Sequence, residues 1–208
     1  TANPEDYTNR GTIVTPLKDR IDSQILTHYP RSIAVSREIT DQESRILTEQ
    51  KAQIYVPELL KDLIEQIAFE ARESEYVDAN SGVSARLSIS SYENLCSTAE
   101  RRLLVNREKQ TQTRILDLYG VIPSITGKVE LVYEGEQEGP LKIAHILISK
   151  AIRTQFVMYF PDPEELKRGE TENPYQKIIN WFNKGNSLDL LMDDSDQDHY
   201  KILNSVTG

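Results

Sequence analysis

Apolar residues recur at steps of three and four over several stretches of the chain, which is the period of a helix with one buried face. The clearest stretch covers 141–160 and is followed by Pro161. A second stretch opens at Pro57-Glu58 and ends before the loop at 78–82. These segments predict the two main helices, and their apolar positions are Ile143, Ile146, Leu147, Ala151, Ile152 and Phe156 in the first and Leu59, Leu60, Leu63, Ile64, Ile67, Ala68 and Ala71 in the second.

Start signals predict shorter helices elsewhere. Thr15-Pro16 places a capping threonine before a proline at the first helical position, so a helix is expected over 15–29. Thr40 and Glu43 have the spacing of a capping box and predict a helix that begins at residue 40. Further helices are expected over 91–106 and 174–184.

Two segments carry patterns that strands share. Small and β-branched residues at 32–36 predict a short strand. Residues 128–134 alternate in the same way, but no partner run lies nearby and a lone strand leaves its backbone unsatisfied, so a helix is favoured there. A polar turn is expected at 135–140. The predicted fold class is therefore mainly α, with one or two strands left from a sheet whose other strands lie outside the chain.

Size and charge narrow the class of protein. The 208 residues are enough for one large or two small domains with a core. The net charge of −9 gives the chain no overall attraction to nucleic acid or to anionic lipid. No signal peptide is recognisable, and no apolar run approaches the roughly 20 residues that span a bilayer. These features predict a protein without a membrane and without nucleic acid as a partner.

The single cysteine, Cys96, has no partner for an internal disulfide, which fits a reducing cytoplasm. Its place in the apolar phase of a helix predicts a buried side chain rather than a nucleophile. Thr1 is not a methionine, and Thr1-Ala2-Asn3-Pro4 is typical of a buried strand that enters a loop. That start favours a fragment of a longer protein.

The sequence lacks the residue patterns that several kinds of ligand-binding site require. The stretch from Gly120 to Lys128 has the wrong spacing for a phosphate-binding loop, so the fragment alone is not expected to hydrolyse ATP. The acidic run at 134–138 lacks the ligand order of a calcium loop and predicts a solvated turn. No metal site is predicted, because the three histidines are scattered without cysteine partners: His28, His145 and His199.

Four residues are candidates for contact with a nucleotide: Asn3, Arg10, Arg20 and Arg86. Guanidinium groups stay charged and make forked hydrogen bonds to phosphate oxygens. Arg86 is expected at a helix start, where backbone N–H groups already favour an anion. Each has a plainer interpretation: Asn3 as an Asn-Pro turn residue, Arg10 as a loop residue, and Arg20 as a surface arginine paired with a nearby aspartate.

The order of three motifs resembles the second half of an AAA+ ATPase of the magnesium-chelatase motor branch, close to the MoxR ATPases. The motifs are Asn3-Pro4-Glu5, the run Pro16-Leu17-Lys18-Asp19-Arg20, and Ser84-Ala85-Arg86-Leu87. The second differs at one position from the leucine-leucine-aspartate-arginine element of that family and keeps the arginine. The stretch 125–136 is also similar to chelatase-like ATPases of bacteria, and together the resemblance covers most of 1–160.

This resemblance implies roles and a domain plan. Asn3 would be the sensor-1 residue, Arg86 the sensor-2 arginine, and Arg20, with Arg10 as the alternative, the arginine finger. Residues 1–50 would be the remnant of the α/β nucleotide-binding core, 51–160 the helical lid, and 161–208 an extra C-terminal helical extension. ATP and Mg²⁺ would be bound only by the full-length protein, between neighbouring copies in a ring that usually has six subunits.

The extension at 161–208 departs from the chelatase pattern, which argues against metal insertion into a porphyrin. The resemblance then implies a cytoplasmic, ATP-driven remodeller that acts on an unknown protein client. The alternative is a helical protein-interaction module without nucleotide chemistry, in which an exposed apolar stripe docks a partner.

Overall fold

The computed structural model describes residues 20, 22–23, 25–166 and 173–206. The chain divides between Arg31 and Ser32 into two units. In the first unit the described residues contain a turn at Arg20 and no helix, so the helix predicted over 15–29 is wrong for 25–29. The predictions for Asn3 and Arg10 lie outside the described residues.

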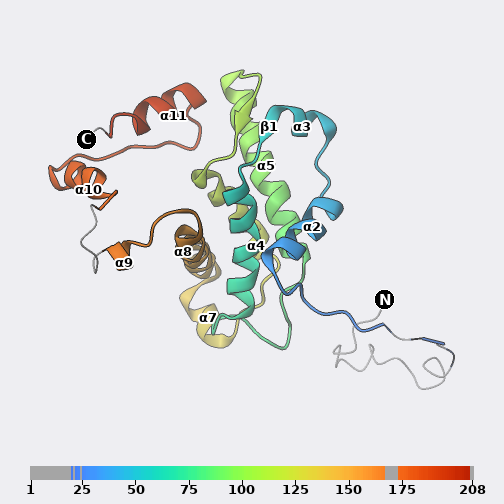
Figure 1. The fold of residues 1–208 in the computed structure, drawn as a ribbon. Helices are drawn as coiled ribbons and strands as arrows, with labels where there is room; N and C mark the ends of the chain where they lie inside the picture. Colours follow the sequence, from blue (N-terminus) through green and yellow to red (C-terminus); the bar gives the residue numbers. More distant parts are fainter. Residues whose placement is uncertain (1–19, 21, 24, 167–172, 207–208) are drawn as a thin grey trace. The chain divides into compact units, whose positions relative to one another are not determined.

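The second unit is mainly helical, which confirms the predicted fold class at that level (Figure 1). Its elements are α2 (Ile33–Glu43), α3 (Thr48–Gln53), β1 (Ile54–Tyr55), α4 (Glu58–Arg72), α5 (Arg86–Asn106), β2 (Thr111–Gln112), the 3-10 helix η1 (Ile115–Val121), α6 (Ile122–Thr126), α7 (Tyr133–Glu138), α8 (Pro140–Tyr159), α9 (Pro163–Leu166), α10 (Gln176–Asn183) and α11 (Asp196–Leu203).

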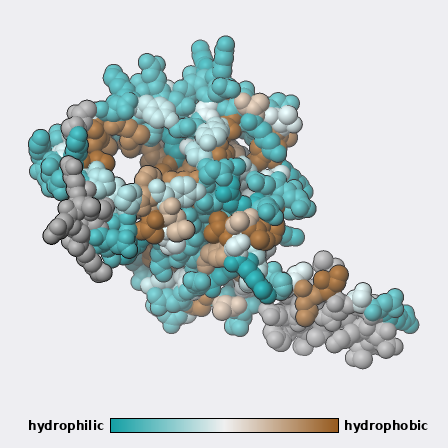
Figure 2. All heavy atoms as spheres, in the orientation of Figure 1, coloured by the Kyte–Doolittle hydropathy of each residue, from teal (hydrophilic) through white to brown (hydrophobic). Residues whose placement is uncertain are grey.

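The core forms where α4 packs against α8 on one side and against α5 on another (Figure 1). The apolar stripes that the sequence predicts supply it, because residues three and four apart share one helix face. Figure 2 shows that the visible outer face is largely hydrophilic, with separate hydrophobic patches. The core side chains with the least exposure are Leu63, Ile64, Ile67, Ala68, Ala71, Leu87, Leu95, Ala99, Ile143, Ala144, Leu147 and Ala151.

The two strands are parallel and short, with Ile54 opposite Thr111 and Tyr55 opposite Gln112. They join the segment before α4 to the segment after α5. Neither corresponds to the strand predicted at 32–36, which is wrong because that segment begins α2. Ser32 caps α2, its side chain accepting a hydrogen bond from Val35 N–H at 3.3 Å.

Other local predictions are corrected as well. Thr40 lies inside α2, where its hydroxyl donates to Glu65, so it does not begin a helix. The segment 128–134 is split: Leu131 forms an antiparallel bridge with Val77, and α7 begins at Tyr133. The turn expected at 135–140 is largely occupied by α7 and by the start of α8.

No helix in the described part of the chain combines the length and apolar character needed to cross a membrane.

Candidate functional site

Arg86 is the first residue of α5, and no side chain of the preceding residue caps this helix. The N-terminal flanking residue, Ala85, supplies no side-chain acceptor, and Ser84 Oγ accepts a hydrogen bond from Arg86 N–H at 3.2 Å. Leu87 N–H donates to Ser84 O at 2.9 Å. The turn Ser84–Ala85 therefore fixes the backbone of Arg86 at a helix start, as expected for this residue. The helix predicted over 91–106 thus begins earlier, at Arg86.

The side chain of Arg86 is exposed, and among the described residues its guanidinium has no ion pair or hydrogen bond. The first turn of α5 holds no acidic residue. A cation at this end of a helix opposes the helix dipole and costs about 0.3–1 kcal/mol. A bound anion would remove that cost, because it would pair with the guanidinium and be favoured by the helix dipole. The N–H groups of Arg86 and Leu87 already donate to Ser84.

Two hydroxyls near this end of α5 lack hydrogen-bond partners within the described structure. Ser88 Oγ and Ser91 Oγ are buried without an acceptor or donor. Both residues lie on the side of α5 that carries Leu87 and Leu95 into the core. They belong to the packed face, so Arg86 is the group in this turn that is available to a ligand.

Arg20 is exposed and lies in a turn of the first unit. Arg86 lies in the second unit, and each is described by itself. Asn3 and Arg10 are outside the described residues. The structure thus places two of the four candidate residues and bears on the local surroundings of Arg86 alone.

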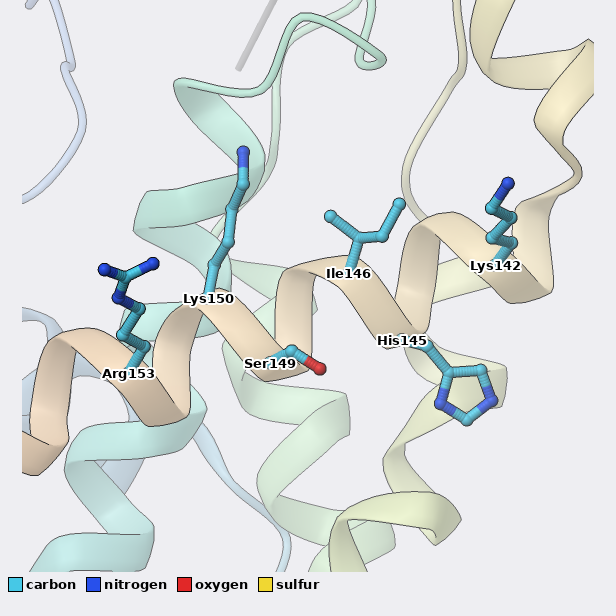
Figure 3. Close-up of a pocket in the computed structure, with 6 residues that line it drawn as sticks. All are labelled: Lys142, His145, Ile146, Ser149, Lys150 and Arg153. Carbon is cyan, nitrogen blue, oxygen red and sulfur yellow. The ribbon is translucent and has the colours of Figure 1, made fainter.

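A hollow of about 360 Å³ lies along α8 and was not predicted from the sequence. Figure 3 shows Lys142, Ile146 and Lys150 rising from one side of the helix, whereas His145 and Ser149 point away from them. Lys142 is paired with Glu138. The residues that line the hollow all come from one helix and do not converge, so this is a cationic helix face rather than an enclosed site.

A second hollow, of about 450 Å³, lies between β1, α4 and the start of β2. Lys61 on its wall forms an ion pair with Glu58 at 3.1 Å, and Glu58 is also paired with Arg37. These contacts lower the pKa of Glu58, first through the hydrogen bond from Arg37. Two of the charged residues on this wall, Glu58 and Lys61, are therefore paired within the protein.

Buried polar groups in the bundle are also used internally. Glu65 is 1% exposed, and its carboxylate accepts hydrogen bonds from Ser36 Oγ at 2.5 Å and Thr40 Oγ1 at 2.6 Å. Cys96 is buried, as predicted, and burial raises the pKa of its thiol to about 12. A thiol held protonated in this way is not a nucleophile at neutral pH.

Metal ligands are not gathered in the described part of the chain, which contains no group of three His, Cys, Asp or Glu side chains that would hold an ion.

Comparisons with known proteins found no match. No protein-family model fits the sequence, and searches of curated proteins and of solved structures gave no significant similarity. The resemblance to chelatase-type ATPases thus rests on the motifs quoted above.

Proposed function

We propose that this chain is the C-terminal part of a magnesium-chelatase-like AAA+ ATPase, a ring-forming remodeller driven by ATP. The chain supplies sensor and arginine-finger residues that contact the nucleotide, and the full-length protein binds ATP and Mg²⁺. Residues 51–160 would form the helical lid, and neighbouring copies would share each nucleotide.

The observation that carries this proposal is the state of Arg86. It is an exposed, unpaired guanidinium at the first residue of a long helix, where a cation is locally unfavourable. A phosphate group at this position would be bound by the guanidinium and favoured by the positive end of the helix dipole. This is the placement that the resemblance implies for a sensor-2 arginine.

Arg20 would act on the same nucleotide from a neighbouring copy, as an arginine finger. Such an arginine stabilises charge that develops on the terminal phosphate and is worth about 10³–10⁵ in kcat. Asn3 would orient the attacking water, with Arg10 as the alternative finger.

The test compares ATP hydrolysis by this chain and by the full-length protein. We expect no turnover by the chain and measurable turnover by the full-length protein. Arg20→Ala in the full-length protein should lower kcat by orders of magnitude with ATP binding kept. Arg86→Ala should weaken nucleotide binding, turnover or both, because the helix end then loses its cation.

Arg45→Ala is the matched control, since Arg45 is also an exposed arginine and its side chain has no partner among the described residues. Its turnover should equal that of the unmodified protein. Unchanged turnover in both Arg20→Ala and Arg86→Ala would overturn the proposal.

A second candidate, an interaction module without nucleotide chemistry, is favoured by α10. This helix has no buried residue, and its apolar side chains Ile178, Ile179 and Phe182 are 41–46% exposed. A full-length protein without ATP turnover, whose client binding survives replacement of Arg20 and Arg86, would favour this candidate.

A further inference from the structure

The C-terminal part of the chain is held to the helical bundle almost without buried residues. After Gln155, the only buried residue in the described ranges 156–166 and 173–206 is His199. His199 lies on α11, whereas α9 and α10 have none. Hydrophobic burial therefore does little to hold the connection between α8 and α11 against the helical bundle of its own chain.

Polar contacts hold α11 instead. We call residues 193–200 the latch segment, and the residues that it contacts at the end of α5 and around β2 the docking site. Arg114 is central to the docking site: it pairs with the Asp196 carboxylate, and its Nη1 donates to Asp194 O at 3.0 Å. The remaining contacts are Arg101 with Asp193, Asn106 Nδ2 with Asp193 O at 2.9 Å, Thr111 Oγ1 with Asp196 Oδ1 at 3.0 Å, Asp196 N–H with Glu108 Oε1 at 2.9 Å, and Gln112 with Tyr200.

These contacts range from exposed to buried. The Arg101 and Asp193 side chains are 57% and 52% exposed, whereas Arg114 is 5% and Asp196 is 23% exposed. Exposed ion pairs exchange readily with water and are screened by salt. The latch segment is thus positioned by charge and hydrogen-bond geometry and is able to leave its site without opening the core.

The connection to the latch segment is long enough to reach another molecule. Its near end is tied to α8, because Tyr175 Oη donates to Pro161 O at 2.7 Å and the Tyr175 ring lies 5.8 Å from that of Phe156. From there, residues 176–192 span up to about 40 Å if α10 stays helical. That reach exceeds the diameter of a small domain, roughly 30 Å.

We infer that the latch segment of one copy of this chain docks on the docking site of a second copy, so that α11 is exchanged between neighbours. The exchanged form keeps every contact named above, because identical residues meet in either arrangement, and such swaps cost little. Among the described residues between α8 and the latch segment, none is buried against the bundle of the same chain. The partner is therefore a second copy of this chain. Arg101 and Arg114 of one copy would bind Asp193 and Asp196 of the other.

Cross-linking between two single-cysteine variants tests this exchange. Arg101→Cys and Asp193→Cys are mixed at roughly 1 mM, the order of the local concentration that a flexible linker provides. A short bis-maleimide is added, because the arginine–aspartate pair spans more than two cysteine side chains. The native Cys96 is buried and does not compete. The substitutions remove only an exposed pair and leave Arg114 and Asp196 in place.

We expect a covalent dimer from the mixture, several-fold above that from the control mixture of Arg101→Cys with Glu165→Cys. Glu165 is an exposed acidic residue of α9 outside the docking site. The double variant R101C/D193C reports docking within one chain. A cross-link within the double variant, together with no covalent dimer from the mixture, would overturn the exchange. Absence of a cross-link in both the double variant and the mixture would overturn it too.

Discussion

Arg102 on α5 and Asp117 on η1 form an ion pair inside the bundle, with 1% and 0% of their side chains exposed. Arg102 Nη2 also donates to Gln112 O at 2.7 Å, and Asp117 Oδ2 accepts from Arg114 N–H at 2.7 Å. The pair therefore joins α5, β2 and η1 directly beneath the docking site. Burial raises the pKa of Asp117, and the nearby Arg102 opposes that rise.

Arg102→Met should destabilise the fold strongly. It leaves the Asp117 carboxylate buried without its cation, and breaking a buried pair in this way costs about 3–5 kcal/mol. The free energy of unfolding from urea titration measures the change. Arg101→Met on the same helix is the control and should cost about 0–1 kcal/mol, since the Arg101–Asp193 pair is exposed. Equal losses in the two variants would contradict this account.

Gly120 is a position where α5 approaches η1 too closely for a side chain. A Cβ added at Gly120 would lie 1.9 Å from Thr98 Oγ1. Gly120→Ala should therefore cost about 1–3 kcal/mol through overpacking. Thr98→Ala removes the hydroxyl, so the double variant should lose less than the sum of the two single variants. A double-mutant cycle on thermal unfolding measures that coupling, and strict additivity would show that the contact is not the cause.

Cys96 should be inert in the folded protein. Its thiol is buried, and its pKa is raised to about 12, so almost no thiolate is present at pH 8. Labelling with a thiol reagent should proceed only as fast as the bundle opens. Adding urea beyond the unfolding transition should bring the labelling rate to that of a free cysteine. Rapid labelling of the native protein would place the thiol at the surface.

The long helices follow from the sequence because their apolar residues keep one period over many turns. The prediction fails where polar residues face the core. Ser36 and Thr40 point to the buried Glu65, so the apolar pattern of α2 is weak and 32–36 resembled a strand. Local patterns also favoured a helix over 128–134, which the structure does not show before Tyr133, since the bridge between Val77 and Leu131 depends on a distant segment.

The candidate sites also differ in whether local sequence predicts them. The start of α5 at Arg86 follows from the local run Ser84-Ala85-Arg86, and the structure places the helix there. The docking site has no such signal, because Arg101 and Arg114 contact Asp193 and Asp196 across more than 80 residues of sequence. The acidic residues at 193–198 do not by themselves indicate that α11 folds onto these arginines.

Docking of the latch segment should weaken in mild acid. His199 is 8% exposed, and its Nδ1 has no hydrogen-bond partner in the described structure. Burial, followed by the charges of Arg114 and Arg102, lowers the pKa of His199, while Asp194 and Asp196 oppose this. The docked state thus favours the neutral ring, so docking is at full strength above about pH 6.5 and falls as the pH drops below that value.

Hydrogen exchange of the α11 amides at pH 7.5 and pH 5.5, corrected for intrinsic rates, measures this loss. Protection should decrease at pH 5.5 while the core helices α4 and α8 stay protected. His199→Gln is the control, because a glutamine side chain carries no charge at either pH and should make the α11 protection nearly independent of pH over this range. Equal losses of protection in the variant and the unmodified protein would assign the effect to another group.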